Sequence, residues 1–94
     1  MVTVIKCINT NFAATARPSI ICSSIIGRTA AWYHKEGRTD VEFIEKNNRE
    51  HHLWLEKNNI FAFPSLLFYK DGELKYSRAH IMAQAQIMEV IENL

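Results

Sequence analysis

Two cysteines and four histidines are the residues of this chain with the clearest chemical potential. Cys7 and Cys22 are too few for a disulfide scaffold, and they lack the spacing of a metal site. A cysteine reacts as a thiolate, which forms beside a cation, at a helix N-terminus or next to a second cysteine. Cys22 lies among isoleucines and Cys7 lies in an apolar stretch, so we interpret both as buried, unreactive thiols. A structural disulfide between them stays open on sequence alone.

The histidines do not indicate a metal site. Adjacent residues on a helix point about 100° apart, so His51 and His52 cannot share a metal as residues four apart do. The glycines at positions 27, 37 and 72 are too far apart for a phosphate-binding loop. We therefore expect solvated histidines, no metal and no cofactor.

Length and charge narrow the class of protein further. The 94 residues predict one domain over positions 1–94, and a formal net charge of +1 argues against a nucleic-acid groove or an anionic-membrane patch. No apolar run approaches the roughly 18–20 residues that span a bilayer. The first residues show no cleavage pattern, so we expect no signal peptide and a cytoplasmic, reducing compartment.

Hydrophobic patterning predicts the elements that must position these residues. Val2–Ile8 is β-branched and apolar on both faces, as in a central strand. A helix follows from Pro18 to Lys35, with Gly37 as its C-terminal cap. Val41 begins a second strand, which ends at the Asn47-Asn48 pair.

The second half of the chain predicts a further helix and a hairpin. Either asparagine of the Asn47-Asn48 pair can cap a helix whose buried stripe is Leu53–Leu55. Ser65–Tyr69 and Leu74–Arg78 are strands joined by an Asp-Gly turn, and Ile81–Leu94 forms the last helix. The order β-α-β-α-β-β-α predicts an α/β fold with a mixed four-stranded sheet flanked by three helices.

This order and the segment Lys57–Leu74, K-N-N-I-F-A-F-P-S-L-L-F-Y-K-D-G-E-L, resemble the thioredoxin family over essentially the whole chain. The shared pattern is an isoleucine, then a proline followed by serine or threonine, an apolar strand and a Lys-X-Gly-Glu turn. The resemblance implies that Pro64 is the cis-proline of that fold. The backbone before such a proline pairs with an extended peptide.

The resemblance also shows what is missing. Thioredoxin-type reduction needs two cysteines, separated by two residues, at the start of the first long helix. Aligning positions 12–19 with that motif puts Ala16 at the attacking position and Ser19 at the resolving one, with Arg17 and Pro18 between them. A methyl group and a hydroxyl cannot form a disulfide, so this alignment predicts no redox reaction.

The departures extend beyond the two cysteines. Thr15 replaces a tryptophan of the family pattern, Thr10 replaces an aspartate, and Ala79-His80 replaces a glycine. These differences favour natural loss of the activity over an engineered double replacement of cysteines. If the motif is instead shifted along the sequence so that Cys22 takes the resolving position, Ser19 takes the attacking position, and no nucleophilic cysteine precedes Cys22.

Aromatic residues supply the remaining signal. In the thioredoxin fold Phe12, Arg17, Phe61, Phe63 and Pro64 would gather where substrates dock, and phenylalanine and arginine are typical interface anchors. Either phenylalanine of Phe61-Ala62-Phe63 could instead pack into the core, and we expect at least one to be exposed.

Two functions follow from these observations. The first is a redox-inactive thioredoxin-like module that binds a protein or extended peptide through the former substrate groove, with a homodimer through the Phe61 and Phe63 rim as a further expectation. The alternative is a thiol-disulfide oxidoreductase in cell redox homeostasis, with its cysteines mutated here or replaced by Cys22.

Overall fold

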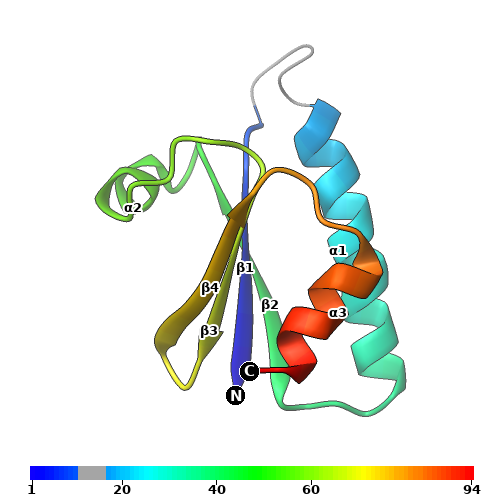
Figure 1. The fold of residues 1–94 in the computed structure, drawn as a ribbon. Coiled ribbons are helices and arrows are strands. Elements are labelled where there is room, and N and C mark those ends of the chain that lie inside the picture. The colour runs from blue at the N-terminus through cyan, green and yellow to red at the C-terminus, as the bar shows by residue number, and fades with distance from the viewer. Residues whose placement is uncertain (11–16) are drawn as a thin grey trace.

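The computed structural model of the chain describes residues 1–10 and 17–94. The elements in these residues follow the order that the sequence predicts, which confirms the α/β architecture of a mixed four-stranded sheet with three helices. They are β1 (Val2–Ile8), α1 (Arg17–Lys35), β2 (Val41–Asn47), α2 (His52–Lys57), β3 (Ser65–Lys70), β4 (Glu73–Ala79) and α3 (Gln84–Glu92). Helices α1 and α3 cover one face of the sheet, and α2 lies on the other (Figure 1).

The sheet has the strand order β2-β1-β3-β4. β1 is parallel to β2 and antiparallel to β3, and β4 pairs with β3 in an antiparallel hairpin. β1 takes an inner position because its side chains are apolar on both faces: Val4 faces α1 and α3, whereas Ile5 and Cys7 face α2. Since β1 and β2 are parallel, their carboxyl ends meet at one end of the sheet.

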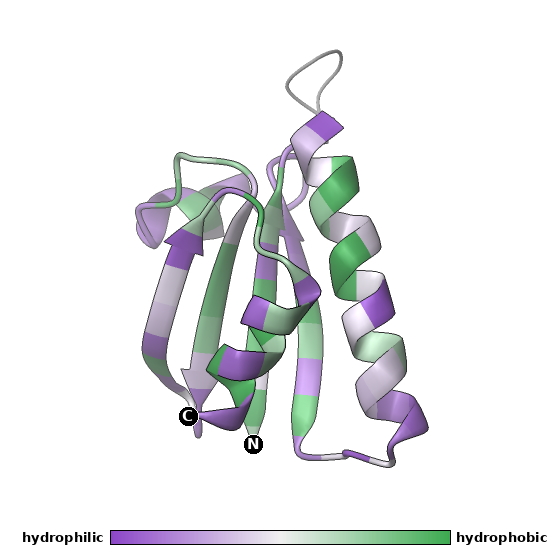
Figure 2. Cartoon of the chain, turned by 45° about the vertical axis from the view of Figure 1, so that its right-hand side comes forward, coloured by the Kyte–Doolittle hydropathy of each residue, from purple (hydrophilic) through white to green (hydrophobic). Residues whose placement is uncertain are grey.

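Most of the core lies between the sheet and helices α1 and α3. Cys22, Ile26 and Tyr33 of α1 pack there with Ile87 and Ile91 of α3. The inner strand β3 is mainly hydrophobic, and the outer strand β4 is mainly hydrophilic (Figure 2).

Beneath α2 the core is smaller. Leu55 is buried, but Leu53, which the sequence places in the buried stripe, is 70% exposed. A helix of six residues turns only one narrow side to the sheet, so the expectation for Leu53 was wrong.

The last helix is shorter than the sequence predicts. It begins at Gln84, where the Gln86 side chain accepts a hydrogen bond from the Ala83 backbone N–H at 3.0 Å. The three residues before Gln84 are not helical, and Met82 among them is buried. Because the helix starts late, Ile87 rather than Ala85 lies in the core.

Two turns form as the sequence predicts. Gly37 ends α1 with φ of 70°, and its N–H donates to the His34 carbonyl oxygen at 3.1 Å. Asp71 and Gly72 join β3 to β4 with φ of 52° and 82°, which fits a type I′ hairpin turn.

Candidate functional site

The N-terminal end of α1 presents an exposed Arg17, a half-buried Pro18 and a buried Ser19. The Ser19 hydroxyl accepts a hydrogen bond from the Asn9 backbone N–H at 2.9 Å, which ties the start of α1 to the end of β1. Phe12 and Ala16 lie outside the described residues. Ser19 therefore supplies a structural contact at the position that the thioredoxin pattern assigns to the resolving cysteine.

Asparagines fasten the ends of β1 and β2 to each other at this end of the sheet. The Asn48 side-chain oxygen accepts hydrogen bonds from the Thr10 N–H and hydroxyl at 2.8 and 3.1 Å. The Asn48 amide also donates to the Asn9 side-chain oxygen at 3.0 Å. Thr10 is exposed, so the position that holds an aspartate in the family pattern contributes here to a surface contact.

The sequence predicted that Asn47 or Asn48 would be the N-cap of α2, but neither residue is. That position belongs to His51, whose side chain makes no capping bond to the helix. The Asn47 side-chain oxygen instead accepts from the backbone N–H groups of Arg49 and Glu50, at 3.0 and 2.8 Å. The asparagine pair thus organises the turn before the helix, because an Asx side chain can bond the backbone two and three residues on.

Both cysteines are free and buried. Cys7 packs with the cluster beneath α2, and Cys22 packs on the opposite face of the sheet. Burial raises the pKa of Cys7 to about 12, and burial likewise raises the pKa of Cys22. Both thiols are therefore protonated near neutral pH, and an unreactive thiol is what such surroundings produce.

The segment between α2 and β3 reaches the same end of the sheet as the start of α1 (Figure 1). The Phe63–Pro64 peptide bond is cis, and Pro64 is buried. The Pro64 carbonyl oxygen accepts from the His80 N–H, and the Ser65 hydroxyl donates to the Ala62 carbonyl oxygen, both at 2.6 Å. The first bond holds the turn against the end of β4, and the second closes the turn itself.

The backbone beside this turn is open. Within residues 1–10 and 17–94, neither the N–H nor the carbonyl of Phe61 or Phe63 makes a hydrogen bond. Backbone groups without internal partners bond to water or to another chain. As far as the described residues go, this segment therefore has donors and acceptors available to an incoming strand.

Phe61 is 72% exposed and stands between two hollows. One hollow, of about 200 Å³, is lined by Asn48, His52, Leu55, Glu56, Ile60, Phe61 and Phe63. The other, of about 210 Å³, lies toward β4 and is lined by Asn59, Ile60, Phe61, Ala62, Ser65, Leu67, Ser77, Arg78 and Ala79. Phe63 is half-buried against the cluster of Ile5 and Cys7, so one phenylalanine is exposed and the other mostly packs inward.

The structure thus brings together Phe61, Phe63 and Pro64 but gives Arg17 no part in either hollow. Among the described residues Arg17 makes no ion pair. Phe61 also has His52, Glu56 and the end of β4 as neighbours, which the sequence did not predict. The local sequence around these polar surface residues does not indicate that they lie near Phe61, because only the fold brings β4 beside the segment before Pro64.

In the part of the chain that the structure describes, no three His, Cys, Asp or Glu side chains are grouped so that they could hold a metal ion. No helix in this part is both long enough and apolar enough to cross a membrane.

Comparison with known proteins gives likenesses of structure only, since neither a family model nor a curated protein matches the sequence. Thioredoxin-2 from a malaria parasite, described as a component of protein secretion machinery, superimposes with a TM-score of 0.85 at 12% identity, covering 100% of this chain and 84% of that one. Thioredoxin from Fasciola hepatica gives a TM-score of 0.72 at 18% identity, over 98% of this chain and 79% of that one.

A chloroplastic thioredoxin z is similar as well, with a TM-score of 0.79 at 16% identity, over 99% of this chain and 77% of that one. These likenesses extend over nearly the whole chain. The fold is therefore thioredoxin-like, as the resemblance in the sequence implied.

Proposed function

We propose that this chain is a redox-inactive thioredoxin-like protein that binds a partner protein, or an extended segment of one, at the surface around Phe61, Phe63 and Pro64. The observation that carries the proposal is the exposed Phe61 ring between two hollows, beside backbone that has no hydrogen-bond partner within residues 1–10 and 17–94. The start of α1, which carries Arg17 and Pro18, lies at the same end of the sheet (Figure 1).

An exposed phenylalanine favours a binding role because water solvates its ring poorly. Burying such a side chain contributes about 1.5–3 kcal/mol, and aromatic residues are enriched among the anchors of interfaces. The open backbone at Phe61 and Phe63 adds a second kind of contact, since an extended peptide binds through main-chain hydrogen bonds. Phe61 then supplies affinity and selectivity, and the backbone fixes the orientation of the peptide.

The thiols support the redox-inactive part of the proposal. Positions 16 and 19 hold alanine and serine, so the aligned motif has no sulfur. The alternative function, a thiol-disulfide oxidoreductase, would have to use Cys22, which is 1% exposed and has a raised pKa. A buried, protonated thiol attacks disulfides slowly. A reducing, cytoplasmic compartment belongs to the proposal, because free buried cysteines need no oxidising environment.

Binding can be tested with a fluorescently labelled, unfolded polypeptide whose cysteines are reduced and carboxymethylated, followed by anisotropy. Phe61→Ala should weaken binding about tenfold. Leu53→Ala is the matched control, because Leu53 is equally exposed on α2 yet lines neither hollow beside Phe61. Equal affinities of the two variants would refute the Phe61 surface as the binding site.

A homodimer through Phe61 and Phe63 is a second form that this proposal can take, since one exposed ring can insert beside another. Light scattering at high protein concentration should then show a dimer that Phe61→Ala dissociates and Leu53→Ala leaves intact. A monomer at every concentration would exclude self-association.

A further inference from the structure

We propose that the outer edge of β4 is a second binding surface, which takes an extended acidic segment of a partner protein as an added strand. The side chains of that strand would enter the cleft between β4 and α3. This cleft does not include Phe61, although Arg78 lines both it and the hollow between Phe61 and β4, so the proposal does not depend on the function proposed above.

β4 is the last strand of the sheet and pairs only with β3 among the described strands. All seven of its residues are exposed. The unpaired N–H and carbonyl groups of such an edge are a template for a further strand. Bulges and charged side chains prevent an edge strand from pairing with other chains unspecifically, and in β4 both lie near the hairpin turn. A bulge lies beside Lys75, and the Lys75 side chain forms an ion pair with Glu73 at 3.3 Å. The half from Tyr76 to Ala79 is regular.

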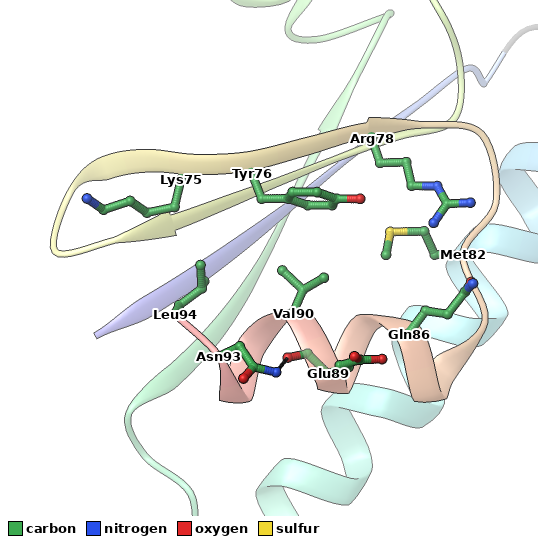
Figure 3. Close-up of a pocket in the computed structure, with 9 residues that line it drawn as sticks. All are labelled: Lys75, Tyr76, Arg78, Met82, Gln86, Glu89, Val90, Asn93 and Leu94. Atoms are coloured by element: carbon green, nitrogen blue, oxygen red, sulfur yellow. Dashed lines mark hydrogen bonds between the residues drawn. The ribbon is translucent and has the colours of Figure 1, made fainter.

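A cleft of about 510 Å³ runs beside this regular half, between β4 and α3 (Figure 3). Its size falls within the range of ligand-binding pockets. The residues that line it are Lys75, Tyr76, Arg78, Met82, Gln86, Glu89, Val90, Asn93 and Leu94. Met82, Val90 and Leu94 provide apolar surface, and polar side chains border it, so the cleft suits an apolar side chain flanked by polar ones.

Charge in the cleft favours an acidic segment. Lys75, which pairs with Glu73, and Arg78 lie on the strand side, whereas Glu89 supplies the one acidic side chain of the lining. Within the described part of the chain the Arg78 side chain makes no ion pair or hydrogen bond. Its guanidinium lies between β4 and α3 in Figure 3, where it can bond a partner's carboxylate in the bidentate manner of arginine.

Strand geometry sets the pattern of the bound segment. Tyr76 and Arg78 are two residues apart and point to the same face, where the Tyr76 ring packs 5.7 Å from that of Phe68. A strand added beside β4 places every second side chain next to them. An acidic residue beside Arg78 and an apolar residue beside Tyr76 give the pattern acidic–any–apolar.

The probe is a fluorescein-labelled peptide of about eight residues with the repeat Glu-Thr-Val-Thr, which places glutamate and valine in turn on one face of the added strand, and lysine replaces glutamate in the control peptide. Anisotropy should show binding of the acidic peptide and at least about tenfold weaker binding of the basic one. Hydrogen exchange of the full chain should show slower exchange at the outward-facing amides of β4 when the acidic peptide is bound.

Variants that change the charge of the cleft in opposite directions make this test more specific. Lys75→Glu and Gln86→Glu should each weaken binding of the acidic peptide about fivefold, and Glu89→Gln should strengthen it about threefold. Gln86→Glu keeps a side-chain oxygen for the Ala83 N–H, and thermal unfolding checks that each variant stays folded. Phe61→Ala should leave this affinity unchanged, which separates this surface from the one around Phe61.

Three results would overturn the proposal: equal binding of the acidic and basic peptides, affinities that the charge variants leave unchanged, or peptide binding without protection of β4. Sedimentation that shows two copies joined through β4 would also overturn it, because the edge would then belong to a dimer.

Discussion

The two ends of helix α1 lie in different surroundings. Comparing them distinguishes the residues that stabilise the fold from those that are available for binding. At its C-terminal end the buried Tyr33 donates a hydrogen bond to Glu92 at 2.9 Å, and Arg38 stacks over the Tyr33 ring at 5.3 Å. Arg38 also binds Asp40 and Glu92, each at 2.9 Å. These contacts join α1 to α3.

Among the described residues, the N-terminal end of α1 makes fewer polar contacts of this kind. Ser19 accepts a hydrogen bond from Asn9 just after β1, Arg17 is exposed, and the Phe61 ring at the same end of the sheet is exposed to solvent. Aromatic residues of similar size therefore do different things at the two ends: Tyr33 fills the core, and Phe61 is available to a partner. Binding surfaces are commonly drawn from the less tightly packed parts of a fold.

The largest expected effect compares these two aromatic residues. Tyr33→Ala should lower the free energy of unfolding by about 3–5 kcal/mol, because it leaves a cavity and removes the bond to Glu92. Phe61→Ala should change it by less than about 0.5 kcal/mol, as for an ordinary surface site. Urea denaturation measures both. Comparable losses in the two variants would mean that Phe61 belongs to the core.

A smaller effect is expected at Ser19. Ser19→Ala removes the acceptor of the Asn9 N–H and should cost about 1 kcal/mol, measured in the same way. Ser19→Thr is the control that keeps the hydroxyl. A destabilisation as large as that of Tyr33→Ala would contradict the contrast between the two ends of the helix.

The smallest expected effect is a change in how the free energy of unfolding depends on pH. Hydrogen bonds from Arg38 and then from Tyr33 lower the pKa of Glu92 below its ordinary 4.5. A lowered pKa in the folded state gives stability that is present above the ordinary value and is lost as the pH falls through the lowered one. The wild-type chain should lose stability from about pH 4.5 downward, and Glu92→Gln should lose less over the same range. Identical pH profiles would show that this carboxylate does not contribute.

Much of the fold follows from local sequence. The apolar run of Val2–Ile8 matches β1 residue for residue, and Gly37 and Asp71-Gly72 form the turns that their types favour. The start of the last helix could not be predicted, because the cap formed by Gln86 and the non-helical residues before Gln84 depend on tertiary packing.

The candidate site was predictable only in part. Pro64 and the exposed Phe61 follow from one short segment. By contrast, the bonds of Asn48 to Asn9 and Thr10 join residues far apart in the chain, and the cleft beside β4 depends on how α3 lies against that strand. Contacts of this kind cannot be predicted from a local sequence pattern.

An insulin-reduction assay with dithiothreitol tests the central claim most directly. It compares the unmodified chain with Ala16→Cys/Ser19→Cys and with Cys22→Ala. We predict no catalysis by the unmodified chain or by Cys22→Ala, and reductase activity only after both cysteines are introduced. Catalysis by the unmodified chain that Cys22→Ala abolishes would contradict the account and establish a thiol-disulfide oxidoreductase.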